Sequence, residues 1–308
     1  GVPTEELCAR WQALGHFYTF SRNHNAIHLP PQWPYLWDQV ARVTRRVGHL
    51  KYSLLDYYNT LFFRAHTLGG TVLDPVWMHF GDEQETWELE EQFMVGDAIL
   101  VSPVMHEGAT SVSVYLPRAV WYDLMTPGAV LLGRGHRRSL DARLPENPIH
   151  VHVRGGSILP RRDTAGIMNT ADWQQRPVQY HVFTGDDGAA TGSLFLDDGL
   201  DVEAGREALE VTLRAALKSR SFQFVARPTQ SNYSAAQTMP LEAVVVTFVD
   251  TTEELCDSEG LTGSVNNRPK ADLDFTTEYF AHTRVCQLTV RDLGVSVSDS
   301  LVLDLQWN

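Results

Sequence analysis

Apolar residues near the start of the chain recur with the spacing of an α-helix. Leu7, Trp11 and Leu14 lie four and three residues apart, and side chains at these intervals share one helix face. Residues 4–6 supply a threonine cap and two carboxylates, which suit the positive end of the helix dipole. The pattern therefore predicts a short helix that stops at Gly15.

The next segment changes to a β-prone pattern. Residues 16–20 are rich in aromatic side chains and lead into a polar cluster at residues 21–25, which predicts a strand followed by a loop. Apolar positions then recur every three or four residues from Val40 to Ala65 and predict one long amphipathic helix. A lone strand between two helices needs neighbouring strands to pair with, so we expect the rest of its sheet to come from upstream polypeptide.

From residue 76 onward, short β-prone stretches alternate with turn residues, and a polar stretch at 161–176 divides them into two blocks. Short strands between turns are typical of β-sandwiches. We therefore predict a helix–strand–helix segment over 1–75 and β-sandwich domains over 76–160 and 161–308. The expected strands are 76–80, 98–104, 111–116, 120–122, 150–153, 157–159, 180–183, 193–196, 209–213, 222–225, 241–249, 286–290 and 301–305.

Composition and charge limit the classes of function. The 308 residues are 43% hydrophobic and 20% charged, as in globular proteins. No apolar run approaches the roughly 18 residues that cross a bilayer. The formal charge is −13, whereas phosphate binding needs a positive surface. We expect no transmembrane segment in this chain and no nucleic-acid partner.

Cysteine usage and one sequon bear on the compartment. Cys8, Cys256 and Cys286 are too few for a disulfide framework and lack metal-ligand spacing. We assign the only internal bridge they allow to Cys256 and Cys286. Cys8 is then either a buried small apolar residue or the partner of a cysteine upstream. Asn232 begins a sequon, so it is a candidate glycosylation site that agrees with a secretory route.

The polar cluster after the predicted strand is a candidate binding site. Arg22, Asn23 and His24 follow that strand, and parallel α/β sheets and barrels bind ligands at the carboxyl ends of their strands. A guanidinium and an imidazole there could hydrogen-bond a polyhydroxylated or anionic ligand. The alternative is structural, with Arg22 paired to a buried carboxylate and His24 capping the next loop.

Paired carboxylates are candidates for glycosyl transfer, which needs two carboxyl groups at a defined separation. The candidates include the pair at 82–83 and the acidic run at 88–91, but the run is typical of a solvated face. The Asp-Asp-Gly motifs at 186–188 and 197–199 are typical of turns between strands. These aspartates, together with Asp201, lack the spacing of an EF-hand calcium loop.

The remaining motifs favour packing over chemistry. His150 and His152 share one face of a predicted strand, where ordinary sheet histidines are the favoured interpretation over metal ligands. The sequence contains no GxSxG elbow, HExxH pair or phosphate loop. Exposed tryptophans can stack on sugar rings; the candidates include Trp33, Trp37, Trp87 and Trp121.

Residues 5–25, which include the Phe-Ser-Arg-Asn-His-Asn motif, resemble the end of the catalytic barrel of family 31 glycoside hydrolases, and above all of the eukaryotic secretory α-glucosidases. Residues 46–66 resemble the eighth barrel helix of that family. Residues 92–104 and 151–160 resemble its proximal β domain. Beyond residue 160 the likeness is confined to residues 194–199 and the closing strand with Trp307. Asp56 stands where the family frequently has proline.

The resemblance implies a fold of mixed class, α/β plus all-β. Residues 1–75 would be the C-terminal end of a (β/α)8 TIM barrel, followed by two antiparallel β-sandwich domains. It also implies a retaining exo-α-glucosidase in which His24 contacts the bound glucose and Arg22 helps to order the pocket. The family's nucleophile and acid/base motifs have no counterpart in this sequence, so we expect no catalytic residue here. The mechanism that the resemblance implies uses no cofactor, and the residue spacings above predict no metal site. Cys8 would pair with an upstream cysteine.

The leading expectation is thus the C-terminal portion or subunit of an α-glucosidase. It would be inactive without the N-terminal catalytic polypeptide of the same enzyme, and would act on α-glucans or maltooligosaccharides. We expect it in the secretory pathway, extracellular or lysosomal. Two alternatives stay open: a non-catalytic carbohydrate-binding or assembly module, and a family 31 transglucosylase or lyase.

Overall fold

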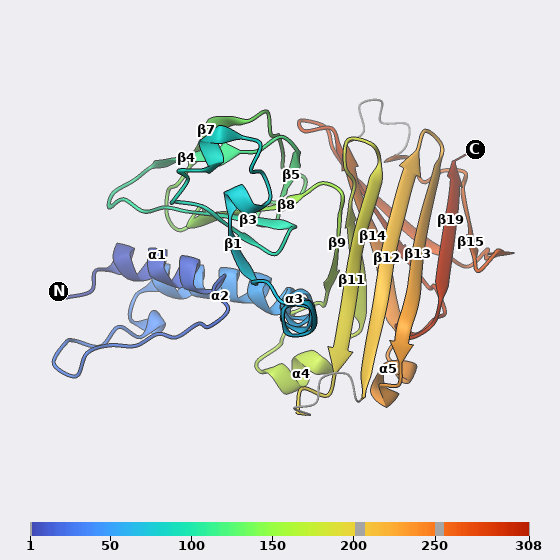
Figure 1. Cartoon of the computed structure of the whole chain (residues 1–308), viewed down its shortest axis with the longest axis horizontal. Helices are drawn as coiled ribbons and strands as arrows, with labels where there is room; N and C mark the ends of the chain where they lie inside the picture. The colour runs from blue at the N-terminus through green and yellow to red at the C-terminus, as the bar shows by residue number, and fades with distance from the viewer. Residues whose placement is uncertain (1, 201–206, 250–255, 308) are drawn as a thin grey trace. The chain divides into compact units, whose positions relative to one another are not determined.

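The computed structural model describes residues 2–200, 207–249 and 256–307 (Figure 1). The chain divides into two compact units. The first comprises the residues up to 52, 71–125 and 131–153, and the second comprises 53–70, 126–130 and the residues from 154 onward. The domain boundaries expected at 75 and 160 stay predictions.

The described residues form the following elements. The helices are α1 (Glu5–Gly15), α2 (Asp38–Ser53), α3 (Leu55–Leu68), α4 (Thr170–Gln174) and α5 (Ser234–Thr238), with 3-10 turns η1 (Pro34–Leu36), η2 (Val76–Met78) and η3 (Gln84–Thr86). The strands are β1 (Leu73–Pro75), β2 (Phe93–Val95), β3 (Ile99–Pro103), β4 (Ser111–Leu116), β5 (Val120–Asp123), β6 (Val130–Leu132), β7 (His136–Asp141), β8 (Ile149–Arg154), β9 (Ser157–Arg161), β10 (Val178–Phe183), β11 (Ala189–Asp197), β12 (Ala208–Lys218), β13 (Ser221–Ser231), β14 (Leu241–Val249), β15 (Leu261–Val265), β16 (Arg268–Pro269), β17 (Asp274–Phe280), β18 (Val285–Arg291) and β19 (Leu301–Trp307).

The predicted first helix is confirmed as α1. Thr4 is its N-cap, with Oγ1 accepting a hydrogen bond from the Leu7 amide at 3.2 Å, and two glutamates lie in its first turn. Arg10 fastens the helix within the first unit, because its guanidinium donates to the carbonyl oxygen of Ala142 at 2.7 Å. Capping and dipole chemistry therefore set where this helix begins, as the sequence indicates.

The strand predicted at residues 16–20 is wrong, because this segment forms turns and bends. The Phe17 amide donates to the Leu14 carbonyl oxygen at 3.0 Å, which extends the end of α1. The Tyr18 carbonyl oxygen accepts from Lys51 Nζ at 3.0 Å. A strand forms only beside another strand, and no described strand pairs with this segment. Turns and a lysine side chain thus satisfy backbone groups that a sheet would otherwise use.

The single long helix predicted from Val40 to Ala65 is instead two helices, α2 and α3. Its apolar stripe is buried as expected, but the helix is interrupted at Leu54, where φ is −103° and ψ is 5°. At the interruption, the Ser53 carbonyl oxygen accepts from the Arg162 amide at 3.3 Å, and the Ser53 hydroxyl accepts from Arg161 Nη2 at 2.9 Å. These bonds come from residues more than a hundred positions away, so helical periodicity could not reveal the break.

The first unit contains a six-stranded sheet in the order β1-β2-β3-β8-β5-β6 and the separate pair β4-β7, counted over the described residues. A core cluster that includes Met94, Leu100 and Trp121 is buried here. The strand expected at 76–80 is wrong. Val76 begins the 3-10 turn η2, and the neighbouring strand β1 lies just before it. Val76 and Phe80, both buried, lie four residues apart, which is a helical and not a strand spacing.

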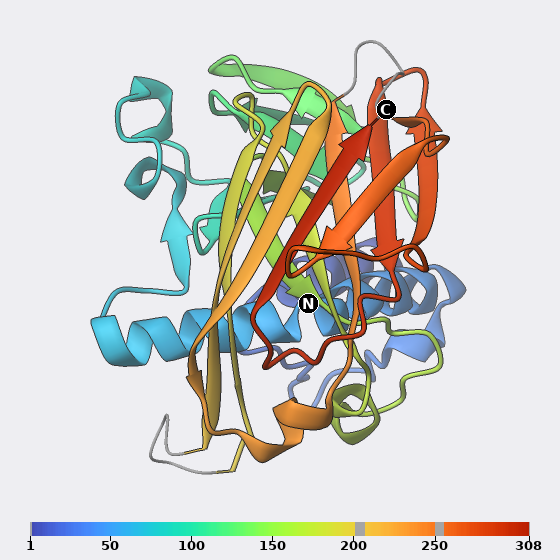
Figure 2. The same ribbon diagram turned by 90° about the vertical axis from the view of Figure 1, so that its right-hand side faces the viewer.

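The second unit is built on one mixed sheet, eleven-stranded within the described residues, in the order β16-β15-β19-β13-β12-β11-β9-β10-β14-β18-β17. Most of its pairings are antiparallel, as predicted, but β10 with β14 and β9 with β11 are parallel. Three strands separate β10 from β13 in this order, yet the rings of Tyr180 on β10 and Phe224 on β13 have centroids only 5.5 Å apart. The sheet therefore curls over itself and encloses its apolar face (Figures 1 and 2).

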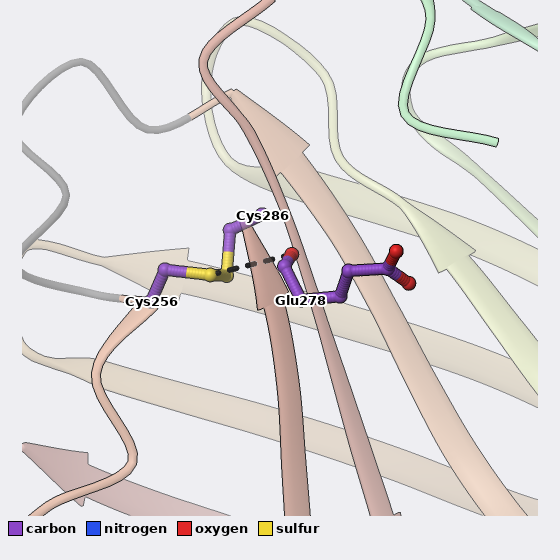
Figure 3. Close-up of a disulfide and its surroundings, with 3 residues drawn as sticks. All are labelled: Cys256, Glu278 and Cys286. Carbon is purple, nitrogen blue, oxygen red and sulfur yellow. Dashed lines mark hydrogen bonds between the residues drawn. A yellow bond between two sulfur atoms is a disulfide. The ribbon is translucent and has the colours of Figure 1, made fainter. Parts of the chain in front are cut away.

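The predicted bridge between Cys256 and Cys286 is confirmed (Figure 3). Cys286 lies on β18 and is fully buried, so the bridge ties the segment before β15 to the sheet. Cys256 Sγ lies 3.5 Å from the Glu278 carbonyl oxygen, which is a contact and not a hydrogen bond, because a disulfide sulfur carries no proton. Cys8 is a free, buried thiol.

Candidate functional site

The polar loop after α1 is held in shape by its own amide side chains. Asn23 Nδ2 donates to the Gln32 carbonyl oxygen at 3.1 Å. Gln32 Nε2 donates in return to Asn23 Oδ1 at 2.8 Å and to the His24 carbonyl oxygen at 3.0 Å. Because these bonds use the Asn23 amide and the His24 backbone, they close the loop without using the His24 imidazole.

Arg22 and His24, the two predicted contact residues, are exposed on this loop. Within the described part of the chain, neither side chain takes part in a hydrogen bond or an ion pair. Arg22 pairs with no described carboxylate, and Asn23 and Gln32 close the loop in place of His24. The roles of Arg22 and His24, as substrate contacts or as structural residues, stay predictions.

Two aromatic side chains extend the exposed surface of this loop. Trp33 and Tyr35 stack with ring centroids 5.6 Å apart and an interplanar angle of 17°, and both are exposed. Trp33 was a candidate from the sequence, whereas Tyr35 was missed. Trp121, by contrast, is buried and donates from Nε1 to the Pro117 carbonyl oxygen at 2.9 Å, so it is a packing residue.

The carboxylate pairs have structural partners. Glu83 is buried and accepts from the Tyr115 hydroxyl at 2.6 Å and from the Arg118 amide at 2.8 Å. Burial and this hydrogen bond raise the pKa of Tyr115. The turn interpretation of the Asp-Asp-Gly motifs is confirmed, because Asp187 and Asp198 each accept from a backbone amide two residues ahead at 2.9 Å. Asp201 lies outside the described residues.

His150 and His152 are buried on β8, with ring centroids 6.1 Å apart. His150 Nε2 lies 2.9 Å from the Asp141 carbonyl oxygen, whereas His152 Nδ1 has no hydrogen-bond partner. Over residues 2–200, 207–249 and 256–307, no group of three His, Cys, Asp or Glu side chains lies close enough to hold a metal ion. Packing accounts for both rings.

Burial makes His152 a source of acid sensitivity. It lowers the pKa of His152 to about 4, whereas an exposed histidine titrates near 6.5. Between these two pH values the unfolded chain therefore binds more protons than the folded chain. The contribution of His152 to the unfolding free energy is fully present above pH 6.5 and is lost as the pH falls through 4. Each unit of pKa shift corresponds to about 1.4 kcal/mol, so His152 should account for up to about 3 kcal/mol of acid destabilisation.

Urea unfolding at pH 7 and at pH 4 tests this expectation. The fall in unfolding free energy between the two pH values should be smaller in His152→Leu than in the unmodified chain. His136→Leu, which replaces an exposed histidine, is the matched control and should leave the fall unchanged. An identical fall in all three proteins would assign the acid sensitivity to other groups.

Asn232, the predicted glycosylation site, is exposed at the end of β13. Its Oδ1 accepts from Gln230 Nε2 at 2.9 Å and from the Ala208 amide at 3.2 Å. The side chain is therefore at the surface, where a glycan could be attached, and glycosylation stays a prediction.

A cavity of about 410 Å³ in the first unit lies along α1 and is lined by Leu7, Trp11, Tyr18 and residues 104–107, among others. Arg22 and His24 do not line it. None of the described helices combines the length and the apolar character needed to cross a membrane.

Two family profiles match consecutive parts of the sequence. The profile described as "Glycosyl hydrolases family 31 TIM-barrel domain" matches residues 1–61. The profile described as "Glycosyl hydrolase family 31 C-terminal domain" matches residues 69–159. The loop with Arg22 and His24 thus lies inside the match to the barrel domain.

Curated relatives are similar over two thirds or more of the chain in two cases. The sequence is 42% identical over 211 residues to a probable alpha/beta-glucosidase of Aspergillus flavus, which is 68% of this chain and 24% of that protein. It is 38% identical over 252 residues to a probable alpha-glucosidase of Oryza sativa subsp. japonica, covering 80% of this chain and 28% of that protein. A human probable maltase-glucoamylase 2 is 42% identical over 199 residues. The chain thus spans under a third of the length of these relatives.

Solved structures share the fold. A crystal structure of glucosidase II alpha subunit matches with a TM-score of 0.84 at 24% identity, covering 100% of this chain and 33% of that chain. A Flavobacterium johnsoniae GH31 dextranase complexed with glucose matches with a TM-score of 0.75 at 20% identity, covering 98% of this chain and 37% of that chain. At these identities the matches show a common fold.

Proposed function

We propose, from the premise that the chain belongs to glycosyl hydrolase family 31, that it forms part of a retaining exo-acting α-glucosidase. Its substrates would be α-glucans and maltooligosaccharides, from which glucose is released at the non-reducing end. The observation that carries the proposal is the His24 loop. It lies within the match to the barrel domain, and it presents an imidazole and a guanidinium to solvent with no intramolecular partner among the described residues.

The proposed reaction needs two carboxyl groups. One acts as nucleophile and forms a covalent glucosyl intermediate, and the other acts first as acid and then as base. We assign both to polypeptide outside this chain. Within it, the His24 imidazole would hydrogen-bond hydroxyl groups of the bound glucose, and Arg22 would help to order the pocket. No cofactor is needed for this chemistry.

The proposed partner is the polypeptide that completes the barrel, which is the N-terminal catalytic part of the same enzyme. Support comes from apolar surface around the segment that has no strand partner. Phe20 is 74% exposed, and Trp11 on α1 is 58% exposed. Residues 16–20 have β-prone side chains without a described strand beside them. Barrel polypeptide placed next to this segment would cover the exposed Phe20 and Trp11 side chains.

Replacing His24 tests the proposed substrate contact. Losing a hydrogen bond to a ligand and leaving its partner unsatisfied costs about 1–3 kcal/mol. In the enzyme assembled from this chain and the catalytic polypeptide, His24→Ala should therefore lower kcat/KM on maltose by roughly 10- to 100-fold. Steady-state kinetics on maltose measures the change.

His28→Ala is the matched control, because His28 is exposed on the same loop four residues further on. We expect its kcat/KM to equal that of the unmodified enzyme. Full activity of His24→Ala would contradict the assignment. Maltose hydrolysis by the 308-residue chain alone would contradict the proposal that the carboxyl groups lie elsewhere.

The same assays separate the alternative functions. A non-catalytic carbohydrate-binding or assembly module would bind saccharide without any activity of the assembled protein. A transglucosylase or a lyase would turn maltose over but release longer saccharides or an unsaturated product in place of two glucose molecules. Chromatography of the products distinguishes these outcomes.

We further propose that the chain enters the secretory pathway and acts outside the cell or in the lysosome. A disulfide between Cys256 and Cys286 and an exposed sequon at Asn232 support this proposal, since disulfides persist in oxidising compartments. A shift in mass on treatment of the secreted protein with an N-glycosidase would support glycosylation at Asn232, provided that Asn232→Gln abolishes the shift.

A further inference from the structure

A second cavity, of about 300 Å³, lies within the second unit. It is framed by α3, α4, the end of β11 and the start of α5, and its size falls at the lower end of the roughly 300–1,000 Å³ of small-molecule pockets. Neither Arg22 nor His24 lines it. No motif in the sequence predicts it, because its walls come from residues far apart along the chain.

Polar side chains with unused hydrogen-bonding groups line this cavity, and two of them, Thr170 and Gln174, are exposed at its edge. Among the described residues, the Gln174 amide, the Tyr233 hydroxyl and the Thr170 hydroxyl have no hydrogen-bond partner. Asp197 Oδ1 accepts from the Gly199 amide at 3.3 Å and from Asn59 Nδ2 at 3.4 Å, which leaves its other oxygen as an acceptor. The cavity thus offers both donors and acceptors.

The charges around the cavity select against an anion. Arg162 also lines it, but its guanidinium is committed to Asp56 at 2.7 Å and to the carbonyl oxygens of Gln174 and Arg176 at 2.8 Å and 2.9 Å. Asp197 has no cationic partner among the residues that the structure describes. A ligand that both donates and accepts, and carries no negative charge, suits this set of groups.

Apolar and aromatic side chains form the rest of the wall. Phe62 on α3 is 45% exposed, and Trp173, Leu196 and Met239 also line the cavity. Aromatic and aliphatic walls with a few placed polar groups are the usual lining of a small-molecule site. A sugar ring fits this combination, since its C–H face packs on apolar side chains and its hydroxyl groups exchange hydrogen bonds at the edge.

We propose that this cavity binds one ring of a neutral saccharide, through Gln174, Asp197 and Tyr233 at its polar edge and Phe62 at its apolar wall. The proposal depends on the cavity alone and holds whatever reaction the chain supports.

Maltotriose binding to the full 308-residue chain tests the proposal. Calorimetric titration and saturation-transfer NMR should detect saturable binding in the millimolar range, which is typical of single-ring sites with few hydrogen bonds. In Gln174→Ala/Tyr233→Phe the affinity should fall about tenfold, because two hydrogen bonds are lost. Tyr233→Phe alone keeps the volume of the ring and should fall by about threefold, with an unchanged melting temperature.

Two controls locate the effect. Gln237→Ala changes an exposed glutamine on α5 that does not line the cavity, and His28→Ala changes an exposed residue on the loop of the first unit. Both should bind maltotriose like the unmodified chain. Absence of saturable binding by the unmodified chain, full binding by the double variant, or loss of binding in His28→Ala would each overturn the proposal. A failure of the His24 kinetic test leaves these results unchanged, so the two proposals are distinguishable.

Discussion

Replacing Asp56 with alanine is expected to destabilise the second unit by about 3–5 kcal/mol, the usual cost of removing one partner of a buried ion pair. Arg162 Nε lies 2.7 Å from Asp56 Oδ2, and the two side chains are only 3% and 2% exposed. The guanidinium also lies 4.5 Å above the Trp173 ring. Without the carboxylate it would remain buried with its charge uncompensated.

The chain contains a matched control for this prediction. Arg143 Nη2 lies 2.7 Å from Asp141 Oδ2, the same separation, but these side chains are 71% and 39% exposed. Asp141→Ala should therefore change the unfolding free energy very little, because solvent screens an exposed pair. The double variant Asp56→Ala/Arg162→Met should recover part of the loss, since it removes both charges.

Urea or thermal unfolding, followed by circular dichroism, measures these differences. The prediction fails if Asp56→Ala and Asp141→Ala unfold at the same midpoint. It also fails if the double variant is less stable than Asp56→Ala, because a buried charge would then not be the cause of the loss.

Removal of the disulfide between Cys256 and Cys286 is expected to cause the second large loss of stability. These cysteines are separated by 30 residues, and a bridge that closes a loop of this length stabilises a protein by about 3–4 kcal/mol, mainly by restricting the unfolded chain. Cys256→Ala/Cys286→Ala should lose this amount. Reduction of the unmodified chain should produce a similar loss.

Cys8→Ala is the control, since Cys8 is a free thiol in the first unit. This variant keeps the bridge, so reduction should destabilise it as much as it destabilises the unmodified chain. Without reductant, its denaturant midpoint should fall less than that of the double cysteine variant. Equal midpoints for the oxidised chain and the double variant would show that the bridge adds no stability.

Sequence patterns predicted those features that depend on neighbouring residues. α1 begins at its threonine cap and ends near Gly15, as the pattern indicates. The strands of both blocks from residue 98 onward were mostly found, because alternating apolar residues between turns report burial directly. Strands with few apolar residues were missed: β7, for example, begins His-Arg-Arg-Ser and is largely exposed.

Features that depend on distant partners were missed. Asp56 was noted in the sequence only as a replacement for a proline, and nothing nearby indicates that Arg162 is its partner. The cavity of the second unit was missed for the same reason. Its lining residues Asn59, Gln174, Asp197 and Tyr233 come from four separate segments that share no sequence motif. The loop with Arg22 and His24 was recognised from its residues, whereas its neighbour Tyr35 carried no signal.

The sequence by itself determined the family, the caps and periods of the helices, most strands and the bridge between Cys256 and Cys286, because each of these is encoded in short-range pattern or in a scarce residue type. Only the tertiary structure decided that residues 16–20 form turns, that the long helix breaks at Leu54 and that the large sheet curls. The physical reason is that backbone groups and buried charges must find partners. When those partners lie a hundred residues away, or are not among the described strands, local propensity gives way to the bonds that are available.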